Sequence, residues 1–283
     1  MITKQDNIEQ IGESTVHHGK QSDRIYLMRF DAADMPDLPV RLTELAGRNQ
    51  YSKIICKIPA PYEQEFAVYG FTKEAEIPGY YNGREDCVFV SLFTKSSRKY
   101  PTKSKKIKEI LDRSVYRSKQ EKAPPVLPDD FSAGIMSEKH ADEMAAVYRE
   151  VFESYPFPIT EAEYIRSTIR DNVIYFGIRH HDRLVALSSI EASYKAENGE
   201  MTDFATLPDY RGRGLAGHLL HAMDDHFREI GLKTAYTIAR AVSPGMNLTF
   251  AGRGYRFGGT LINNTQIAGS LESMNIWYKA IGE

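Results

Sequence analysis

The stretch Asp209–Ala216 reads DYRGRGLA and brings two arginines and two glycines together directly before an amphipathic run. Apolar residues then recur at helical spacing, which predicts a helix from about Gly214 to Gly231. The first amides of a helix have no intrahelical partner, and the helix dipole adds partial positive charge at that end. Because Gly212 lets the backbone approach a ligand closely and Arg211 and Arg213 add charge, the stretch predicts a pyrophosphate site. Nucleotides, dinucleotides and coenzyme A all carry such a group.

The elements around this loop restrict the choice of fold. Residues 173–207 are rich in β-branched and aromatic side chains, and turn signals divide them into three expected antiparallel strands. A helix opens with a capping residue at Ser137, and a strand (234–240), a shorter helix (243–254) and two strands (255–266 and 272–281) follow the loop. No GxGxxG follows the first strand of a βαβ unit, and the antiparallel strands argue against a doubly wound nucleotide fold.

A change in composition near the middle of the chain predicts two domains. Residues 98–130 are strongly basic, contain little apolar material and end in a proline cluster, with a solvated helix expected at 105–119. We therefore predict an N-terminal α/β domain at 1–97, a linker at 98–130 and a second domain at 131–283. The alternative, a basic nucleic-acid arm, lacks the aromatic residues that would stack on bases.

The first domain repeats part of the second in order of elements. Residues 51–93 are expected to form strand, short helix, strand, turn and strand, and the chain from residue 234 follows the same order. Tyr69-Gly70-Phe71 corresponds to Gly254-Tyr255, whereas DYRGRGLA has no counterpart in the first half. The pattern indicates either a degenerate internal duplication or the recurrence of a common αβ pattern.

The bulk composition argues against several classes of protein. The 283 residues are 42% hydrophobic and 26% charged, and the net charge of −2 gives no reason to expect nucleic-acid binding. No apolar run approaches the roughly 18 residues that a membrane span needs. Cys56 and Cys87 lie in strand-like patterns without metal-ligand spacing, so we expect no disulfide framework and no metal. A soluble, cytoplasmic protein is predicted.

Arg211–Ala216 matches the pattern [QR]-x-x-G-x-[GA], and with the order of elements the second domain resembles the GCN5-related N-acetyltransferase (GNAT) superfamily. The resemblance implies an α+β fold with a mostly antiparallel, splayed sheet flanked by helices. The first domain is expected to resemble a degenerate half of this GNAT fold. The resemblance implies acetyl-CoA as co-substrate, its pantetheine arm beside the backbone of Phe204, Ala205 and Thr206. A further contact is expected from Asn247. The pyrophosphate would lie on Arg211, Gly212, Arg213, Gly214, Leu215 and Ala216.

Longer segments carry a closer resemblance. SYPFPIT, TDFATLPDYRGRGLA and LESMNIWYK are similar to the β-lysine N6-acetyltransferases, and EAEIPGYYNGRED extends the similarity into the first half. The resemblance implies transfer of an acetyl group to the terminal amine of β-lysine, giving a compatible solute. Other amines (a diamine, free lysine, an aminoglycoside or a protein lysine) and a catalytically silent acetyl-CoA-binding module are the alternatives. The expected partner is a small-molecule amine, with neither nucleic acid nor membrane.

Acetylation of such an amine requires a base. A lysine-type amine has a reference pKa of about 10.4, so deprotonation at pH 7 costs about 4.6 kcal/mol. Glu200 stands where several superfamily members have a catalytic glutamate, and Glu191 and Asp203 are rival carboxylates on adjacent strands. Phe250 stands where many members have a tyrosine that protonates the leaving thiolate, so the acid is unassigned.

The acceptor site is expected to combine an anion contact with polar walls. Arg240 is the candidate for the carboxylate, through the bidentate geometry of its guanidinium. Three possibilities are open for the first domain: shaping this pocket, forming a homodimer or adding stability. Tyr155 and Phe157 are expected in a loop over the acceptor, and the last two strands contribute Asn263, Asn264 and Glu272.

Overall fold

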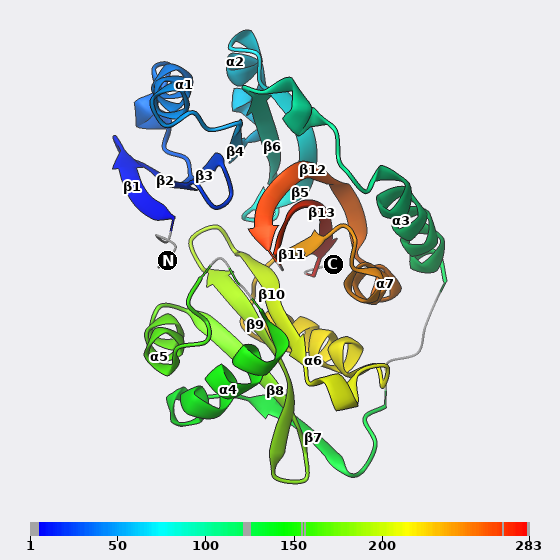
Figure 1. Cartoon of the computed structure of the whole chain (residues 1–283). Helices are drawn as coiled ribbons and strands as arrows, with labels where there is room; N and C mark the ends of the chain where they lie inside the picture. Colours follow the sequence, from blue (N-terminus) through cyan, green and yellow to red (C-terminus); the bar gives the residue numbers. More distant parts are fainter. Residues whose placement is uncertain (1–5, 121–125, 154, 156, 268, 282–283) are drawn as a thin grey trace.

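The computed structural model describes residues 6–120, 126–153, 155, 157–267 and 269–281, which form two lobes joined through one sheet (Figure 1). The described strands follow the order β1-β2-β3-β4-β6-β5-β12-β13-β11-β10-β9-β8-β7. The first half contributes β1 (Asn7–Ile11), β2 (Ser14–Gly19), β3 (Arg24–Arg29), α1 (Leu38–Asn49), β4 (Lys53–Pro59), α2 (Glu63–Val68), β5 (Thr72–Tyr81) and β6 (Glu85–Phe93).

The second half follows a connecting helix, α3 (Ser104–Ser118). Its first elements are β7 (Phe131–Ile135), α4 (Ala141–Val151), α5 (Ala162–Arg170), β8 (Val173–His180), β9 (Arg183–Ser193) and β10 (Asn198–Thr206). Next come α6 (Leu215–Glu229), β11 (Thr234–Arg240), α7 (Pro244–Gly252), β12 (Arg256–Ile267) and β13 (Ser270–Ala280). The expected elements from 173 onward are present, whereas β7 and α5 were not anticipated.

The two halves repeat one topology. Each contains one parallel strand pair, β3 with β4 and β10 with β11, within otherwise antiparallel neighbours. Each also has its last hairpin folded back, so that β6 lies beside β4 and β13 lies beside β11. The helices α2 and α7 end alike, with Phe66 and Phe71 packed at 5.2 Å between ring centroids and Phe250 and Tyr255 at 5.0 Å. This agreement favours the internal duplication over a chance recurrence.

The halves meet where β5 lies antiparallel to β12, with Ala75 opposite Gly259. A Cβ on Gly258 would lie 2.3 Å from the Glu76 carbonyl oxygen, and one on Gly259 would lie 2.3 Å from that of Glu74. Such distances are far inside van der Waals contact. The two glycines are therefore required for the close approach of the halves.

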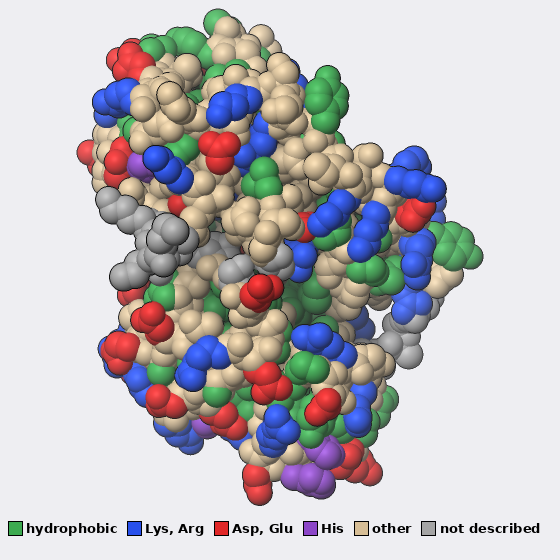
Figure 2. Space-filling view, in the orientation of Figure 1, with side chains coloured by type: hydrophobic (Ala, Val, Ile, Leu, Met, Phe, Trp, Pro, Cys, Tyr) green, Lys and Arg blue, Asp and Glu red, His purple; other side chains and the backbone are tan. Residues whose placement is uncertain are grey.

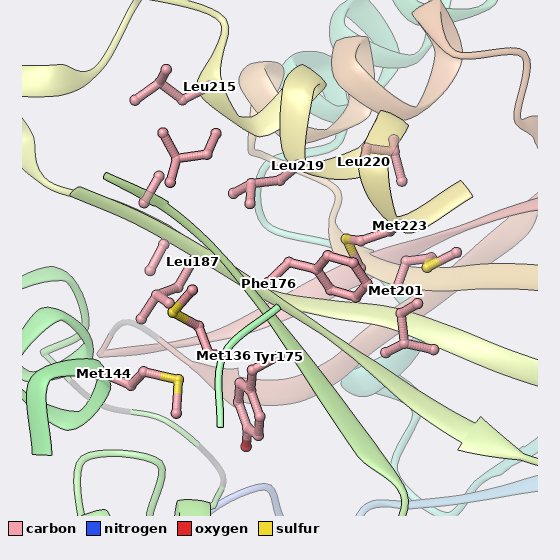
Figure 3. Close-up of a cluster of buried hydrophobic side chains, with 14 of the residues drawn as sticks. Met136, Met144, Tyr175, Phe176, Leu187, Met201, Leu215, Leu219, Leu220 and Met223 are labelled. Atoms are coloured by element: carbon pink, nitrogen blue, oxygen red, sulfur yellow. The ribbon is translucent and has the colours of Figure 1, made fainter. Parts of the chain in front are cut away.

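The core of the second half lies on both faces of its sheet. Successive residues of a strand point to opposite faces, so Tyr175 faces Met144 of α4 while Phe176 faces Met223 of α6 (Figure 3). Leu215 and Leu219 place the first turns of α6 against this core. The packing fixes where the helix begins, and with it the loop that precedes the helix.

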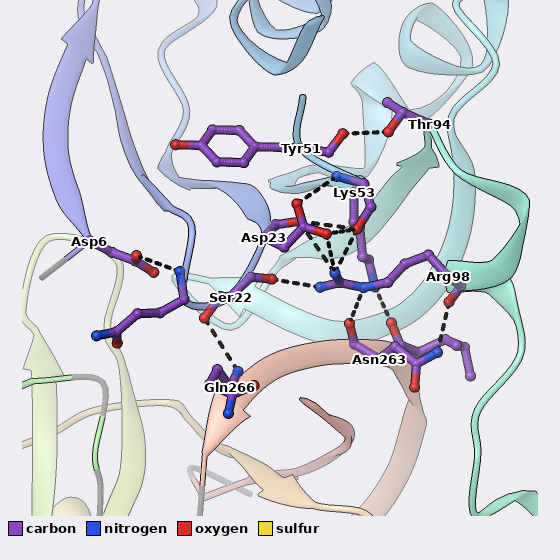
Figure 4. Close-up of polar contacts among 12 residues, drawn as sticks. Asp6, Ser22, Asp23, Tyr51, Lys53, Thr94, Arg98, Asn263 and Gln266 are labelled. Carbon is purple, nitrogen blue, oxygen red and sulfur yellow. Dashed lines mark hydrogen bonds and ion pairs between the residues drawn. The ribbon is translucent and has the colours of Figure 1, made fainter. Parts of the chain in front are cut away.

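The basic segment after residue 97 packs more closely than a solvated linker. Arg98 is 5% exposed and donates to the carbonyl oxygens of Asn263 and Ser22, both at 2.7 Å, and to the Ser52 hydroxyl at 2.6 Å (Figure 4). The expected helix is present as α3, which packs against α7 while its Lys and Arg side chains gather on the outer surface (Figure 2). Part of the predicted linker, residues 121–125, lies outside the described residues.

Candidate active site

The loop before α6 presents a row of free backbone amides. Gly212 and Gly214 both have a φ of +77°, a conformation that strongly favours glycine, and a Cβ on either would meet no protein atom within 4 Å. In the described part of the chain, the amides of residues 212–216 donate to no protein acceptor. They stand at the N-terminus of a 15-residue helix, where the dipole favours an anion.

Beside this loop, β10 and β11 separate. Their parallel pairing ends at Glu200 opposite Tyr236, although the strands continue to Thr206 and Arg240. A strand edge with unpaired amides and carbonyls is thereby left for an extended ligand. The Phe204 and Thr206 side chains line the adjoining cavity, whereas the Ala205 side chain is buried.

An open cavity of ≈ 730 Å³ extends along the loop and the separated strands. Its walls include Arg211, Gly212, Gly214, Leu215 and Ala216, together with Phe204, Thr206 and residues of α7. Arg213 is absent from this wall, and its guanidinium lies over the Tyr210 ring, 5.3 Å from the centroid. The shape and the free amides fit a long ligand with a pyrophosphate group.

A second cavity of ≈ 290 Å³ lies between the two lobes, and we call it the acceptor cavity. Both halves line it. The first half contributes His17, Arg24, Tyr26, Met28 and Lys57, and the second contributes Glu191, Glu200, Asp203 and the walls shared with the larger cavity. The shared residues are Phe152, Phe204, Arg240, Ser243, Met246 and Ile267. The two cavities therefore adjoin, as a reaction between two bound molecules requires.

Three carboxylates gather in the acceptor cavity. Glu200 of β10 lies directly opposite Glu191 of β9, so both side chains stand on the same face of the sheet. Asp203 reaches the same cavity from a β-bulge, where its φ is +55°. Its Oδ1 accepts from the Tyr155 hydroxyl and its Oδ2 from the Ser189 hydroxyl, each at 2.6 Å. The structure thus brings the three candidate bases together in one cavity.

Burial raises the pKa values of all three carboxylic acids. Burial and the charge of Asp203 raise the pKa of Glu200 to about 7, against the opposing effect of the Lys57 ammonium. Burial raises the pKa of Glu191, and the charges of Glu200 and Asp203 raise it further. Burial raises the pKa of Asp203 although three hydroxyl groups hydrogen-bond to it. Because neighbouring carboxylates titrate together, the cluster can hold a proton near neutral pH.

The aromatic candidates for the acceptor site lie in the cavity wall. Tyr155 packs against Phe152 with 4.8 Å between ring centroids. Phe157 reaches across the lobe boundary to His17, at 5.7 Å between centroids. Asn264 also lines the cavity. These three of the predicted acceptor residues stand where an amine substrate would contact them.

Asn247 and Asn263 lie elsewhere, contrary to expectation. The Asn247 Nδ2 donates to two backbone carbonyls, and its Oδ1 accepts from Asn275 at 2.8 Å and from Trp277 at 2.9 Å. It lines neither cavity, so no polar atom is left for coenzyme A. Asn263 donates to the carbonyls of Arg98 and Tyr100. Both amides serve the packing of the protein.

Arg240 and Glu272 form one unit at the junction of the cavities. Glu272 is 2% exposed, and its Oε1 lies 2.9 Å from the Lys103 ammonium and 3.5 Å from Arg240 Nη2. Despite burial, hydrogen bonds from Ser270 and Lys103 lower the pKa of Glu272. Glu272 therefore orients Arg240 but lines neither cavity. Arg240 lines both cavities, and its guanidinium is already paired with the Glu272 carboxylate.

Sequence reasoning did not identify the contributions of β3 and β4. Arg24, Tyr26 and Met28 alternate with the buried Ile25 and Leu27, so one face of β3 lines the acceptor cavity. The parallel ladders of the two halves begin alike, which puts Tyr26 at the ladder position that Glu200 takes in the second half. Extending the internal duplication to β3 would have pointed to this face.

The geometry defines a two-substrate enzyme that brings a pyrophosphate-bearing donor to a carboxylate cluster, and the chain belongs to the acetyltransferase (GNAT) family. The model of that family matches residues 141–248. The protein is an acetyl-CoA-dependent N-acetyltransferase with a GNAT fold and transfers acetyl to an amine. Among the described residues, no helix is long and apolar enough to cross a membrane, and no group of metal-binding side chains is found.

Three curated proteins are similar over most of their length. The β-lysine N(6)-acetyltransferase of Methanococcus maripaludis is 35% identical over 97% of this chain and 98% of its own. The β-lysine N(6)-acetyltransferase of Methanosarcina mazei is 32% identical over 85% and 95%. N-acetyltransferase YodP of Bacillus subtilis is 32% identical over 95% and 96%. The similarity therefore includes the first half, which lies outside the matched family model.

Proposed function

We propose that the protein transfers the acetyl group of acetyl-CoA to the terminal amine of β-lysine, giving N6-acetyl-β-lysine. The observation that carries the proposal is the acceptor cavity of ≈ 290 Å³, which holds the carboxylate cluster and adjoins the cavity of ≈ 730 Å³ along the 211–216 loop, which we call the donor cavity. Its size suits a small diamino acid. The names of two relatives that align with both halves support β-lysine among such amines.

Glu200 acts as the base in this proposal, directly or through a water molecule. With a pKa of about 7, Glu200 is partly ionised at neutral pH and accepts a proton from the ammonium group of the acceptor. The freed amine attacks the thioester carbonyl, a C–N bond forms, and the C–S bond breaks. The Asp203 carboxylate holds further negative charge beside the ammonium and favours its binding.

The leaving thiolate takes up a proton at the junction of the cavities. Phe250 occupies the wall there, and Tyr255 is not free because its hydroxyl donates to Asp224 at 2.7 Å. Ser243 and Arg240 are polar residues of the shared wall. We assign the stabilisation of the thiolate to these two residues, with water supplying the proton.

The product has a simple electrostatic property. β-Lysine carries two ammonium groups and one carboxylate, and acetylation removes one positive charge to leave a zwitterion without net charge. Such a molecule can accumulate without disturbing the ionic balance, which fits a compatible solute and a role in osmoadaptation. Dependence on acetyl-CoA fits action in the cytoplasm.

Release of free thiol from acetyl-CoA in the presence of β-lysine, lysine or spermidine tests the proposal. The highest kcat/KM is expected with β-lysine. Stimulation only by another amine would overturn the acceptor assignment and leave the acetyltransferase assignment standing. Mass spectrometry of the product distinguishes acetylation at N6 from acetylation at the 3-amino group.

A further inference from the structure

The acceptor cavity contains a buried arginine without a counter-ion. Arg24 of β3 is 6% exposed and lines the cavity, and its Nη1 donates to the Thr265 hydroxyl at 3.0 Å. Within the described residues its Nε donates to no acceptor, and no carboxylate lies within 4.0 Å of its guanidinium. Burial lowers the pKa of Arg24 to about 10, so the side chain is still charged at neutral pH.

Lys53 and Arg98, two other buried cations of the same half, are paired. The Lys53 ammonium lies 2.6 Å from Glu74, and Arg98 combines a 3.3 Å ion pair to Asp23 with hydrogen bonds from each of its nitrogens (Figure 4). A buried charge without a partner destabilises a fold, so such a charge is normally neutralised within the protein. Arg24 differs from Arg98 in facing a cavity, where a ligand can supply the missing anion.

An unpartnered acceptor lies beside this unpartnered donor. Asn264 is 4% exposed and lines the cavity, and its Nδ2 donates to the same Thr265 hydroxyl at 3.3 Å. In the part of the chain that the structure describes, its Oδ1 accepts no hydrogen bond. The Thr265 hydroxyl thus accepts hydrogen bonds from both residues: from Arg24, whose guanidinium has no anion among the described residues, and from Asn264, whose Oδ1 has no N–H donor there. A carboxylate with an ammonium group close to it satisfies both.

We propose that Arg24 binds the substrate carboxylate and that Asn264 receives the neighbouring ammonium group, so that the first half selects amino acids over simple diamines. This inference rests on the proposed function, because it assigns the far end of the same acceptor. Tyr26 follows Arg24 on the same face of β3, about 6.6 Å along the strand. It lines the same cavity as Glu200, and the charge of Glu200 contributes to raising the pKa of Tyr26. Because Arg24 and Glu200 line the same cavity, a substrate whose carboxylate is at Arg24 can present its reacting amine to Glu200.

The test compares β-lysine with its decarboxylated analogue, a diaminopentane that retains both amines. For wild-type enzyme kcat/KM should be much higher with β-lysine. Arg24→Gln should reduce kcat/KM for β-lysine about 100-fold, mainly through KM, and change that for the diamine by no more than about twofold. Arg24→Lys should restore part of the preference, and calorimetry should give an unchanged Kd for acetyl-CoA.

Arg98→Gln is the matched control, since it removes a buried arginine whose hydrogen bonds are all internal. It should lower thermal stability without changing the preference for β-lysine over the diamine. Equal losses with both substrates in the Arg24 variants would overturn the inference, as would a wild-type preference for the diamine. If wild type favours lysine over β-lysine, the proposed acceptor is wrong, and lysine against its own decarboxylated diamine still tests Arg24.

Discussion

Replacing Glu200 with Gln should change activity and stability in opposite directions. The substitution preserves the size of a side chain that lies opposite Glu191 and removes its charge. Loss of a general base should lower kcat/KM for the acceptor about 100-fold or more near neutral pH. In wild type the rate should rise with pH through about 7, because only the ionised carboxylate accepts a proton. The variant should lose this rise, and the pKa of Glu191 should fall once the neighbouring charge is gone.

The same pKa determines whether Glu200→Gln raises or lowers the stability of the protein. The pKa of Glu200 is raised from 4.5 in the unfolded chain to about 7 in the fold. The protonated side chain therefore stabilises the fold below pH 4.5, and this stabilisation is lost as pH rises through about 7. The full shift corresponds to about 3 kcal/mol, and access of water to the cavity reduces the expected effect to about 1–2 kcal/mol. Glu200→Gln should therefore be more stable than wild type at pH 8 and similar at pH 4.

Thiol release across pH and urea unfolding at the two pH values provide the measurements. Glu197→Gln is the control, since Glu197 precedes the same strand and lines neither the donor nor the acceptor cavity. An unchanged pH–rate profile in Glu200→Gln would refute its role as the base. A variant that is both inactive and less stable at pH 8 would show that the side chain serves the fold.

Three further substitutions test other parts of the structure. Gly214→Ala, which strains a φ of +77° without a clash, should weaken acetyl-CoA binding at least about tenfold in calorimetry and cost about 1 kcal/mol of stability. Gly259→Ala places a Cβ 2.3 Å from the Glu74 carbonyl oxygen, so it should cost at least about 2 kcal/mol in denaturant unfolding and raise KM for the acceptor more than that for acetyl-CoA. Asn247→Ala leaves buried partners without hydrogen bonds and should cost about 3 kcal/mol, yet a Kd for acetyl-CoA that rises more than tenfold would restore the predicted contact.

Features set by local chemistry could be predicted from the sequence. The loop at 211–216 was identifiable because glycines and arginines directly before an apolar helix are typical of an anion site. Glu200 was selected by resemblance, since several superfamily members have a catalytic glutamate at the same position relative to that loop, and its role as the base stays a prediction. The unpredicted α5 is amphipathic, with apolar residues at helical spacing, but it is only nine residues long and buries only Ile165, so its pattern was overlooked beside those of the longer helices.

Features set by long-range packing could not be predicted in the same way. Arg24 meets Thr265 only because β5 joins β12, and no local pattern indicates that pairing. Asn247 was expected to contact acetyl-CoA in place of an asparagine that the superfamily often has one turn earlier, and Asn263 was expected in the acceptor site because the last two strands often form its wall. A polar side chain near a site often forms its hydrogen bonds with buried backbone groups of the protein. Whether it does so depends on three-dimensional contacts.

An amine held in the acceptor cavity touches both lobes at once, because β3 and β10 form opposite parts of its wall. Bound acceptor therefore links the lobes across a boundary where, among the described residues, the ladder between β5 and β12 consists of one residue pair. By mass action, acceptor at 100 times its Kd adds about 2.7 kcal/mol to the free energy of unfolding. Accumulation of the acceptor would therefore raise the thermal stability of the enzyme as well as its rate.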